Sequence, residues 1–248
     1  MSKHTNWFKD WFNSHYYHIL YNHRDYSEAE DFISRLFTYL NLSKQNSKVL
    51  DLACGKGRHS IQINRLGYDV VGMDLSEESI KYANKFSNDT LHFSTGDMRD
   101  FTFPYKFNLI VNLFTSFGYF NDEIDNQQVI NSIEQNLGNN GLLVLDYLNV
   151  VKTVSSLPTK EKIKKEELTF SIKKEVKNGF IEKDISFSHN QNNHHYKEFV
   201  KVIDLPVFES YFKNAGIEII ELFGDYQLNP FNLRESDRLI LLARKKDV

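Results

Sequence analysis

The stretch VLDLACGKG, residues 49–57, decides the fold of this chain. An apolar run from Val49 to Ala53 predicts a short strand, which leads directly into a turn that contains Gly55 and Gly57. Glycine lets a ligand approach the backbone without a Cβ in the way, and the helix expected at 58–66 points its N-terminus at that ligand. The stretch therefore predicts a strand, a ligand-binding loop and a helix.

The rest of the chain repeats this alternation of strand and helix roughly every 20–25 residues, which is typical of a parallel sheet with helices on both faces. Further strands are expected at 69–73, 92–94, 107–113 and 142–145, and closing strands at 217–222 and 239–243. Helices are expected at 79–86, behind a Ser76 cap, at 123–137, before a GNNG turn, and at 206–214. The predicted fold class is therefore α/β, with a seven-stranded, mostly parallel sheet.

Two segments fall outside this pattern. Residues 5–22 space their aromatic and apolar side chains as an amphipathic helix, and Ser27 with Glu30 forms a capping-box pattern that opens a second helix. Residues 168–177, 180–188 and 196–203 alternate between apolar and polar, and Asn178-Gly179 between the first two is a strong hairpin signal. We expect an N-terminal helical lid at 1–45, a core at 46–158 and 206–248, and an antiparallel insertion of about three strands at 159–205.

Composition and charge narrow the class of protein. The net charge is −3, from 30 basic and 33 acidic residues, so a concentrated positive face for nucleic acid is not expected. Acidic residues interrupt the lysines of 160–165 and 173–174, which are expected to be solvated. Cys54 is the one cysteine, which rules out an intramolecular disulfide. With no signal-peptide pattern and no long apolar run, we expect a cytoplasmic protein that does not contact a membrane.

Acidic residues occupy three strand ends in order. Asp51 precedes the glycine turn, Asp74 ends the second strand, and Asp97 with Met98 follows the third. At the end of the second strand a carboxylate can accept hydrogen bonds from both ribose hydroxyls of a bound nucleoside. The Asp97 carboxylate could accept a hydrogen bond from the adenine amine, while the Met98 side chain packs on the adenine ring. A NAD fingerprint would need Gly or Ala where Ser60 stands.

These segments resemble the class I S-adenosylmethionine-dependent methyltransferases. VLDLACGKG is similar to their motif I, VVGMD to motif II, and STGDMRDF, FNLIVNLFTSFGYF and LGNNGLLVLDY to the segments around strands three to five. The resemblance covers about residues 48–147 and implies a Rossmann-like sheet and S-adenosylmethionine as cofactor. The small-molecule members are the nearest in character, such as the sugar-amine N-methyltransferases and glycine N-methyltransferase, which also have a helical lid and a late antiparallel insertion.

The resemblance implies a set of site residues. The methionine part of the cofactor lies over the loop, the ribose at Asp74, the adenine between Leu75 and the Asp97-Met98 pair, and the sulfonium near the end of strand four. N-terminal residues close over it, although helix packing and surface charge explain those residues equally well. The cofactor set is Tyr17, Arg24, Tyr26, Asp51, Ala53, Gly55, Gly57, Arg58, Asp74, Leu75, Asp97, Met98, Asn112, Leu113 and Phe114.

Candidate catalytic residues are Tyr119 and Tyr147, which follow strands four and five, where such folds bind ligands. Lys56 and Arg58 place two cations at the loop, where they could attract the cofactor carboxylate or an acidic substrate. The pair His194 and His195 is expected in an exposed hairpin loop, and His189, His194 and His195 lack the partners of a metal set, so no metal is expected.

The strand-four segment lacks a [DN]PP[YFW] tetrapeptide, and Cys54 is not in a Pro-Cys setting, which argues against DNA methylation. The expected reaction is methyl transfer to N or O of a small molecule. The alternatives are a NAD-dependent oxidoreductase and a catalytically silent cofactor-binding relative, and a homodimer is possible.

Overall fold

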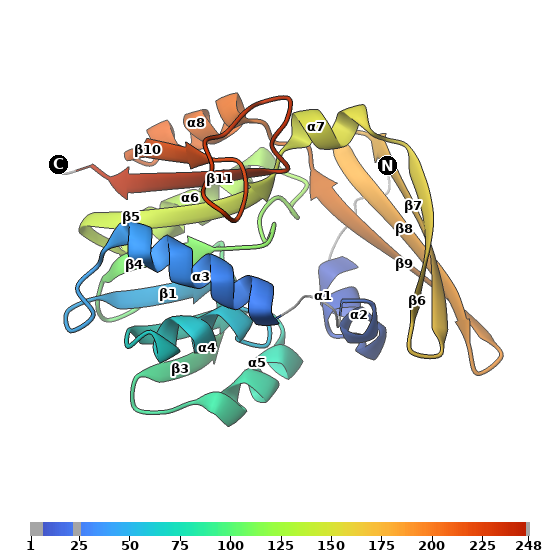
Figure 1. Ribbon diagram of the computed structural model, residues 1–248, viewed down its shortest axis with the longest axis horizontal. Helices are drawn as coiled ribbons and strands as arrows, with labels where there is room; N and C mark the ends of the chain where they lie inside the picture. Colours follow the sequence, from blue (N-terminus) through green and yellow to red (C-terminus); the bar gives the residue numbers. More distant parts are fainter. Residues whose placement is uncertain (1–6, 22–25, 247–248) are drawn as a thin grey trace.

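The computed structural model describes residues 7–21 and 26–246, apart from the side chains of Lys9, Tyr26, Ser27 and Glu28. The larger of its two sheets has seven strands in the order β10-β11-β5-β4-β1-β2-β3 (Figure 1). Strand β11 is antiparallel to both of its neighbours, and the other pairs are parallel. The strands are β1 (Lys48–Leu52), β2 (Asp69–Asp74), β3 (Leu91–Thr95), β4 (Phe107–Asn112), β5 (Leu137–Leu148), β10 (Ile217–Phe223) and β11 (Arg238–Lys245). The expected α/β fold is confirmed.

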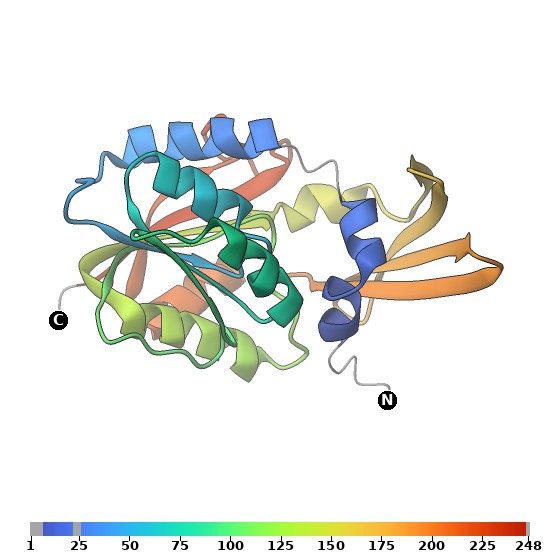
Figure 2. The same cartoon turned by 90° about the horizontal axis from the view of Figure 1, so that it is seen from below.

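Helices cover both faces of this sheet (Figure 2). Helices α3 (Tyr26–Leu40) and α4 (Arg58–Arg65) pack in one apolar cluster, while α6 (Glu123–Asn136) and α8 (Leu205–Asn214) pack in the other. Helix α5 (Glu77–Ala83) and the 3₁₀ turn η1 (Asn84–Phe86) lie against the β2–β3 edge. Because a parallel strand is buried on both faces, its sequence is a continuous apolar run: Val49 joins one cluster, and Leu50 joins the other.

The N-terminal segment forms two short helices and not the single helix predicted for 5–22. Helix α1 (Trp7–Phe12) ends before Asn13, and α2 (His15–Leu20) begins after Ser14, whose Oγ accepts from the Tyr16 amide at 3.1 Å. A serine that caps a new helix competes with continuation of the old one. The second predicted helix is confirmed as α3, but it begins at Tyr26, so Ser27 lies in its first turn and is not its N-cap.

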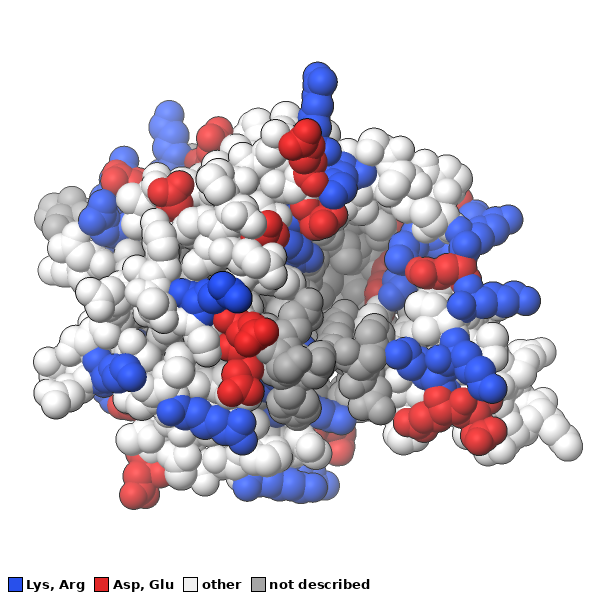
Figure 3. All heavy atoms as spheres, in the orientation of Figure 1, with Lys and Arg blue, Asp and Glu red and all other residues white. Residues whose placement is uncertain are grey.

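The insertion is a separate antiparallel sheet with four strands in sequence order: β6 (Thr159–Lys165), β7 (Leu168–Lys177), β8 (Phe180–His189) and β9 (Asn192–Lys201). The prediction of about three strands missed β6, whose exposed lysines hide the strand pattern and suit a sheet edge. The hairpin at Asn178-Gly179 is confirmed, with both residues at positive φ. Lys and Arg side chains alternate with Asp and Glu over the insertion face seen in Figure 3.

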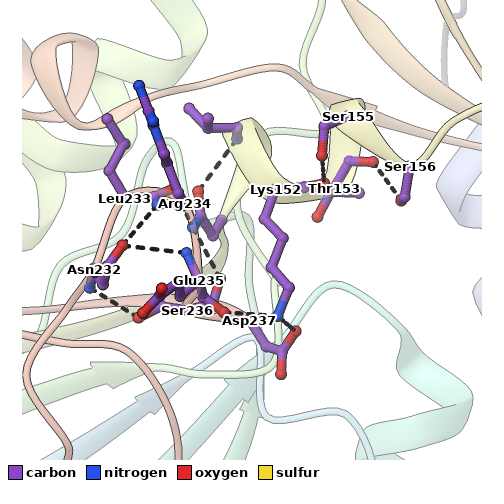
Figure 4. Close-up of polar contacts among 12 residues, drawn as sticks. Lys152, Thr153, Ser155, Ser156, Asn232, Leu233, Arg234, Glu235, Ser236 and Asp237 are labelled. Carbon is purple, nitrogen blue, oxygen red and sulfur yellow. Dashed lines mark hydrogen bonds and ion pairs between the residues drawn. The ribbon is translucent and has the colours of Figure 1, made fainter.

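The end of β5 connects the core to the insertion through α7 (Val150–Ser155). The GNNG segment lies inside β5 as a bulge, because Phe107 pairs with Leu137 while Leu109 pairs with Leu142. Asn149 donates through Nδ2 to the carbonyls of Leu233 and Ser236 at 2.9 and 2.8 Å. Figure 4 shows how Lys152 adds bonds to the Glu235 carbonyl and the Asp237 carboxylate, both at 2.6 Å. These contacts anchor the start of the insertion to the loop before β11.

Within residues 7–21 and 26–246, no helix is long and apolar enough to cross a lipid bilayer.

Candidate functional site

Two adjoining hollows lie at the carboxyl ends of the parallel strands, where they meet the N-terminal helices. The first is mostly apolar and is lined by Phe8, Leu75, Gly96 and Met98, among others. The second opens to solvent and is lined by both polar and apolar side chains. Both hollows are bounded by Phe12, Ala53, Asp74 and Tyr119. A ligand with an apolar end and a polar end fits this continuous space.

The loop after β1 has three residues in the left-handed region: Ala53 at φ 61°, Gly55 at φ 55° and Gly57 at φ 81°. A Cβ on Gly55 would meet nothing within 4 Å, so this glycine keeps the backbone open towards the second hollow. A Cβ on Gly57 would lie 2.7 Å from the Phe93 ring of β3. The two glycines therefore have different roles: Gly55 borders the hollow, and Gly57 allows close packing.

Asp74 ends β2 and lines both hollows. Its Oδ2 accepts from the Gly55 amide and its Oδ1 from the Ser76 amide, both at 2.8 Å. Burial raises the pKa of this carboxyl above its usual value, and the backbone amides oppose that rise. Because a carboxylate offers about four acceptor sites, it can still bind two hydroxyl groups from a ligand.

Leu75, Asp97 and Met98 all line the first hollow. Arg99 forms an ion pair with the Asp97 carboxylate, with Nη2 2.7 Å from Oδ2, and also lies 3.3 Å from Asp125. The sequence did not predict this ion pair, which fixes the orientation of Asp97 at the wall of the hollow.

The end of β4 contributes Leu113 and Phe114 to the second hollow, together with Arg58 from α4. The Arg58 guanidinium lies 4.3 Å from the centre of the Phe114 ring, a cation–π contact. Asn112 is buried; its Nδ2 donates to the Leu52 carbonyl at 2.9 Å. Its Oδ1 has no hydrogen-bond donor among the described residues. Asn112 itself lines neither hollow, although Leu113, the next residue, lines the second.

Asp51 and Tyr147 line neither hollow. Asp51 is almost completely buried and accepts from Ser60 Oγ at 2.6 Å, while burial raises its pKa to about 6. The buried Tyr147 hydroxyl donates to the Lys201 carbonyl at 2.5 Å, and burial raises its pKa well above the usual value. Tyr119, in contrast, lines both hollows and donates to the Thr115 carbonyl at 2.6 Å.

The N-terminal helices close one side of the site, with Tyr17 lining the second hollow. Arg24 lies outside the described residues, as does the side chain of Tyr26. Several residues that line the hollows were not predicted from the sequence, because helix packing accounts for aromatic side chains equally well. They are Phe8, Phe12, His18, Tyr21 and His59.

The same helices are bound to the insertion sheet. Trp11 Nε1 and the Tyr21 hydroxyl both donate to Glu198 Oε1 of β9, at 2.6 and 2.5 Å. Lys183 of β8 lies 3.5 Å from the other oxygen of Glu198. A third apolar cluster, which includes Phe170, joins α1 and α2 to β7 and β8. The lid and the insertion thus share a core.

The prediction of an exposed hairpin loop is wrong for His194, which is half-buried on β9. The Tyr16 hydroxyl lies 3.0 Å from His189 Nδ1 and 3.3 Å from His194 Nε2, and the His194 ring stacks on Phe187. These histidines lie on β8 and β9, which extend further than expected and face α2. His195 is exposed and lies 2.5 Å from Asp184.

Residues 43–202, more than half of the chain, match a family model described as a methyltransferase domain. The chain is 36% identical over 101 residues to dTDP-3-amino-3,4,6-trideoxy-alpha-D-glucopyranose N,N-dimethyltransferase of Streptomyces venezuelae, a match that spans 40% of this chain and less than half, 42%, of that protein. It is 27% identical over 219 residues to a putative methyltransferase of Bacillus subtilis, covering 81% of this chain and 85% of the relative. The crystal structure of an S-adenosylmethionine-dependent methyltransferase from Clostridium acetobutylicum has a similar fold, with a TM-score of 0.78 at 20% identity, over 94% of this chain and 96% of that one.

Proposed function

The chain belongs to the methyltransferase-domain family and uses S-adenosylmethionine, and from this premise we propose that it methylates a nitrogen or oxygen of a small molecule, with an amine favoured. The observation that carries this proposal is the position of Asp74. Its carboxylate lies where the apolar and polar hollows join, and backbone amides hold it in place.

The residues present fit the cofactor. Asp74 offers acceptor sites for the two ribose hydroxyls, and the apolar hollow beside Leu75 and Met98 suits the adenine ring. The open backbone at Gly55 leaves room for the methionine part in the second hollow.

The cofactor, when bound, supplies a methyl group on positively charged sulfur, an excellent leaving group. The protein then needs to align the acceptor and exclude water. Phe12 and Tyr119 line both hollows, and the centres of their rings lie 5.5 Å apart. These aromatic groups supply an apolar wall at the junction, and such a wall limits solvent access to the reacting atoms.

An amine acceptor suits the charges of the second hollow. Lys56 and Arg58 line it, and Asp74 is the one carboxylate among its described lining residues. Nearby cations disfavour a protonated amine and so favour the neutral form, whose lone pair attacks the methyl group. An alcohol would need a base to remove its proton. The amino-sugar relative, named as an N,N-dimethyltransferase, points in the same direction.

Calorimetry with S-adenosylhomocysteine tests the cofactor site. Asp74→Asn removes a charged acceptor, so the free energy of binding should weaken by about 1–3 kcal/mol. Asp89→Asn, an exposed change in the loop before β3, should leave the affinity unchanged. If the wild-type protein shows no binding at millimolar ligand, the proposal is wrong.

Turnover separates the remaining alternatives. Formation of S-adenosylhomocysteine across a panel of small amines and alcohols should be fastest with an amine. Tight cofactor binding without turnover on any acceptor would favour a catalytically silent relative. Binding of NADH in place of S-adenosylhomocysteine, followed by fluorescence, would favour an oxidoreductase.

A further inference from the structure

A basic mouth, defined here as Lys56, Lys81 and Lys85 around the Tyr82 ring, adjoins the second hollow. These residues line a third, more open hollow together with His15, His18 and Glu78. Lys56 comes from the glycine loop, Lys81 and Tyr82 from α5, and Lys85 from η1. His18, Lys56 and Tyr82 also line the second hollow, so the two spaces are continuous.

Positive charge is concentrated at this mouth. The ammonium groups of Lys56 and Lys85 lie over the same Tyr82 ring, at 4.9 and 5.1 Å from its centre. Within the described part of the chain, none of the three lysines forms an ion pair with a carboxylate. Burial, and then the neighbouring Lys85, lowers the pKa of Lys56. Like charges held this close repel each other, and an anion would relieve that repulsion.

The charge count indicates the class of anion. Three lysines face one acidic lining residue, Glu78, so these four side chains leave about two uncompensated positive charges. Burial, followed by Lys56 and His15, lowers the pKa of His18 to about 4, so this imidazole is neutral near pH 7. A single carboxylate would neutralise only half of this charge. A phosphate carries about two negative charges on compact oxygens, and lysines bind it as point charges.

We propose that the methyl acceptor carries a phosphate or diphosphate group that docks at the basic mouth while its nucleophile occupies the second hollow. This inference rests on the proposed methyltransferase function and names the substrate class of the same site. Lys56 makes the connection, because it lies beside Gly55 in the loop and lines both spaces. Lys81 and Lys85 line only the mouth among these hollows, so they bind the acceptor and leave the cofactor untouched.

The test titrates inorganic pyrophosphate into protein saturated with S-adenosylhomocysteine, followed by calorimetry. The double variant Lys81→Gln/Lys85→Gln should bind pyrophosphate at least about tenfold more weakly, since it removes two of the three ammonium groups. Its affinity for S-adenosylhomocysteine should equal that of the wild type. The matched control is Lys160→Gln/Lys162→Gln on the exposed edge strand β6, which removes the same charge far along the chain.

Three results would overturn the inference while leaving the proposed function intact: pyrophosphate competes with S-adenosylhomocysteine, the two double variants bind pyrophosphate equally well, or succinate binds as tightly as pyrophosphate. Competition between pyrophosphate and S-adenosylhomocysteine would indicate that the basic mouth binds the cofactor carboxylate. Failure of the wild-type protein to bind S-adenosylhomocysteine would instead overturn the proposed function, and this inference with it.

Discussion

Arg238 of β11 donates through Nε to the fully buried carboxylate of Asp146 at the end of β5, at 2.7 Å. The other oxygen of Asp146 accepts from the Phe114 amide at 2.8 Å, and Arg238 NH2 donates to Thr115 Oγ1 at 2.9 Å. Phe114 and Thr115 both have φ near 58°, a region that side chains disfavour. The ion pair therefore holds a strained loop that lines the second hollow.

Arg238→Gln should destabilise the protein strongly, because it leaves the Asp146 charge buried without a cation. Loss of one partner of a buried pair costs about 3–5 kcal/mol in the free energy of unfolding, measured by urea denaturation. Arg244→Gln is the control, since its contact with Glu218 is exposed and long, at 3.8 Å, and its loss should cost less than about 1 kcal/mol. Equal effects from the two variants would refute the assignment.

Replacing the two loop glycines should separate stability from binding. Gly57→Ala should lower the melting temperature sharply, because its Cβ would lie 2.7 Å from the Phe93 ring and φ is 81°. Gly55→Ala adds strain of about 1 kcal/mol from its positive φ but no clash, and its Cβ projects towards the second hollow. It should therefore weaken S-adenosylhomocysteine binding more than Gly57→Ala does, at a temperature where both variants are folded. The opposite order would contradict these roles.

Glu198→Gln should loosen the N-terminal helices. Trp11 and Tyr21 lose a charged acceptor, and each such bond contributes about 1.5–3 kcal/mol when the acceptor is ionised. Amide hydrogen exchange in residues 7–21 should accelerate, and the affinity for S-adenosylhomocysteine should fall. Glu218→Gln, at the exposed edge strand β10, provides the comparison. Unchanged exchange in both variants would show that Glu198 does not hold the lid.

Asp51→Asn should change the dependence of stability on pH. Burial raises the pKa of Asp51 from 3.8 to about 6, so the folded state favours the protonated acid. The wild type therefore loses stability as the pH rises from about 4 to above 6, by about 3 kcal/mol at 1.36 kcal/mol per pH unit. An uncharged asparagine keeps an acceptor for Ser60 and avoids this loss. Unfolding measurements should show that the variant is more stable relative to the wild type at pH 7.5 than at pH 4. A difference in stability that is the same at both pH values would argue against a buried ionisable Asp51.

The parallel sheet could be predicted because its strands are buried on both faces. Val49 and Leu50 pack on opposite sides, so the sequence of β1 is a continuous apolar run next to a glycine turn. Strand β6 could not be predicted, since an edge strand needs few apolar residues and its lysines resemble a solvated loop.

Some residues of the candidate site could also be predicted from the sequence, and others could not. Asp74 and Gly55 follow from their positions at strand ends, where a parallel sheet gathers its ligand contacts. The bond between Trp11 and Glu198 joins residues 187 positions apart, and the bond between Arg238 and Asp146 joins residues 92 apart. No local pattern encodes such pairs, because each partner is also an ordinary surface or helix residue in its own segment.

The core that α1 and α2 share with β7 and β8 imposes an order on folding. Helices α1 and α2 are synthesised before the sheet they cover, which lies around Phe170 and Phe187, about 150 residues later in the chain. In the meantime the aromatic side chains of residues 7–21 have no native partner on the insertion. We expect this contact to form late in folding, because it joins segments far apart in the chain, and until then these apolar side chains stay exposed.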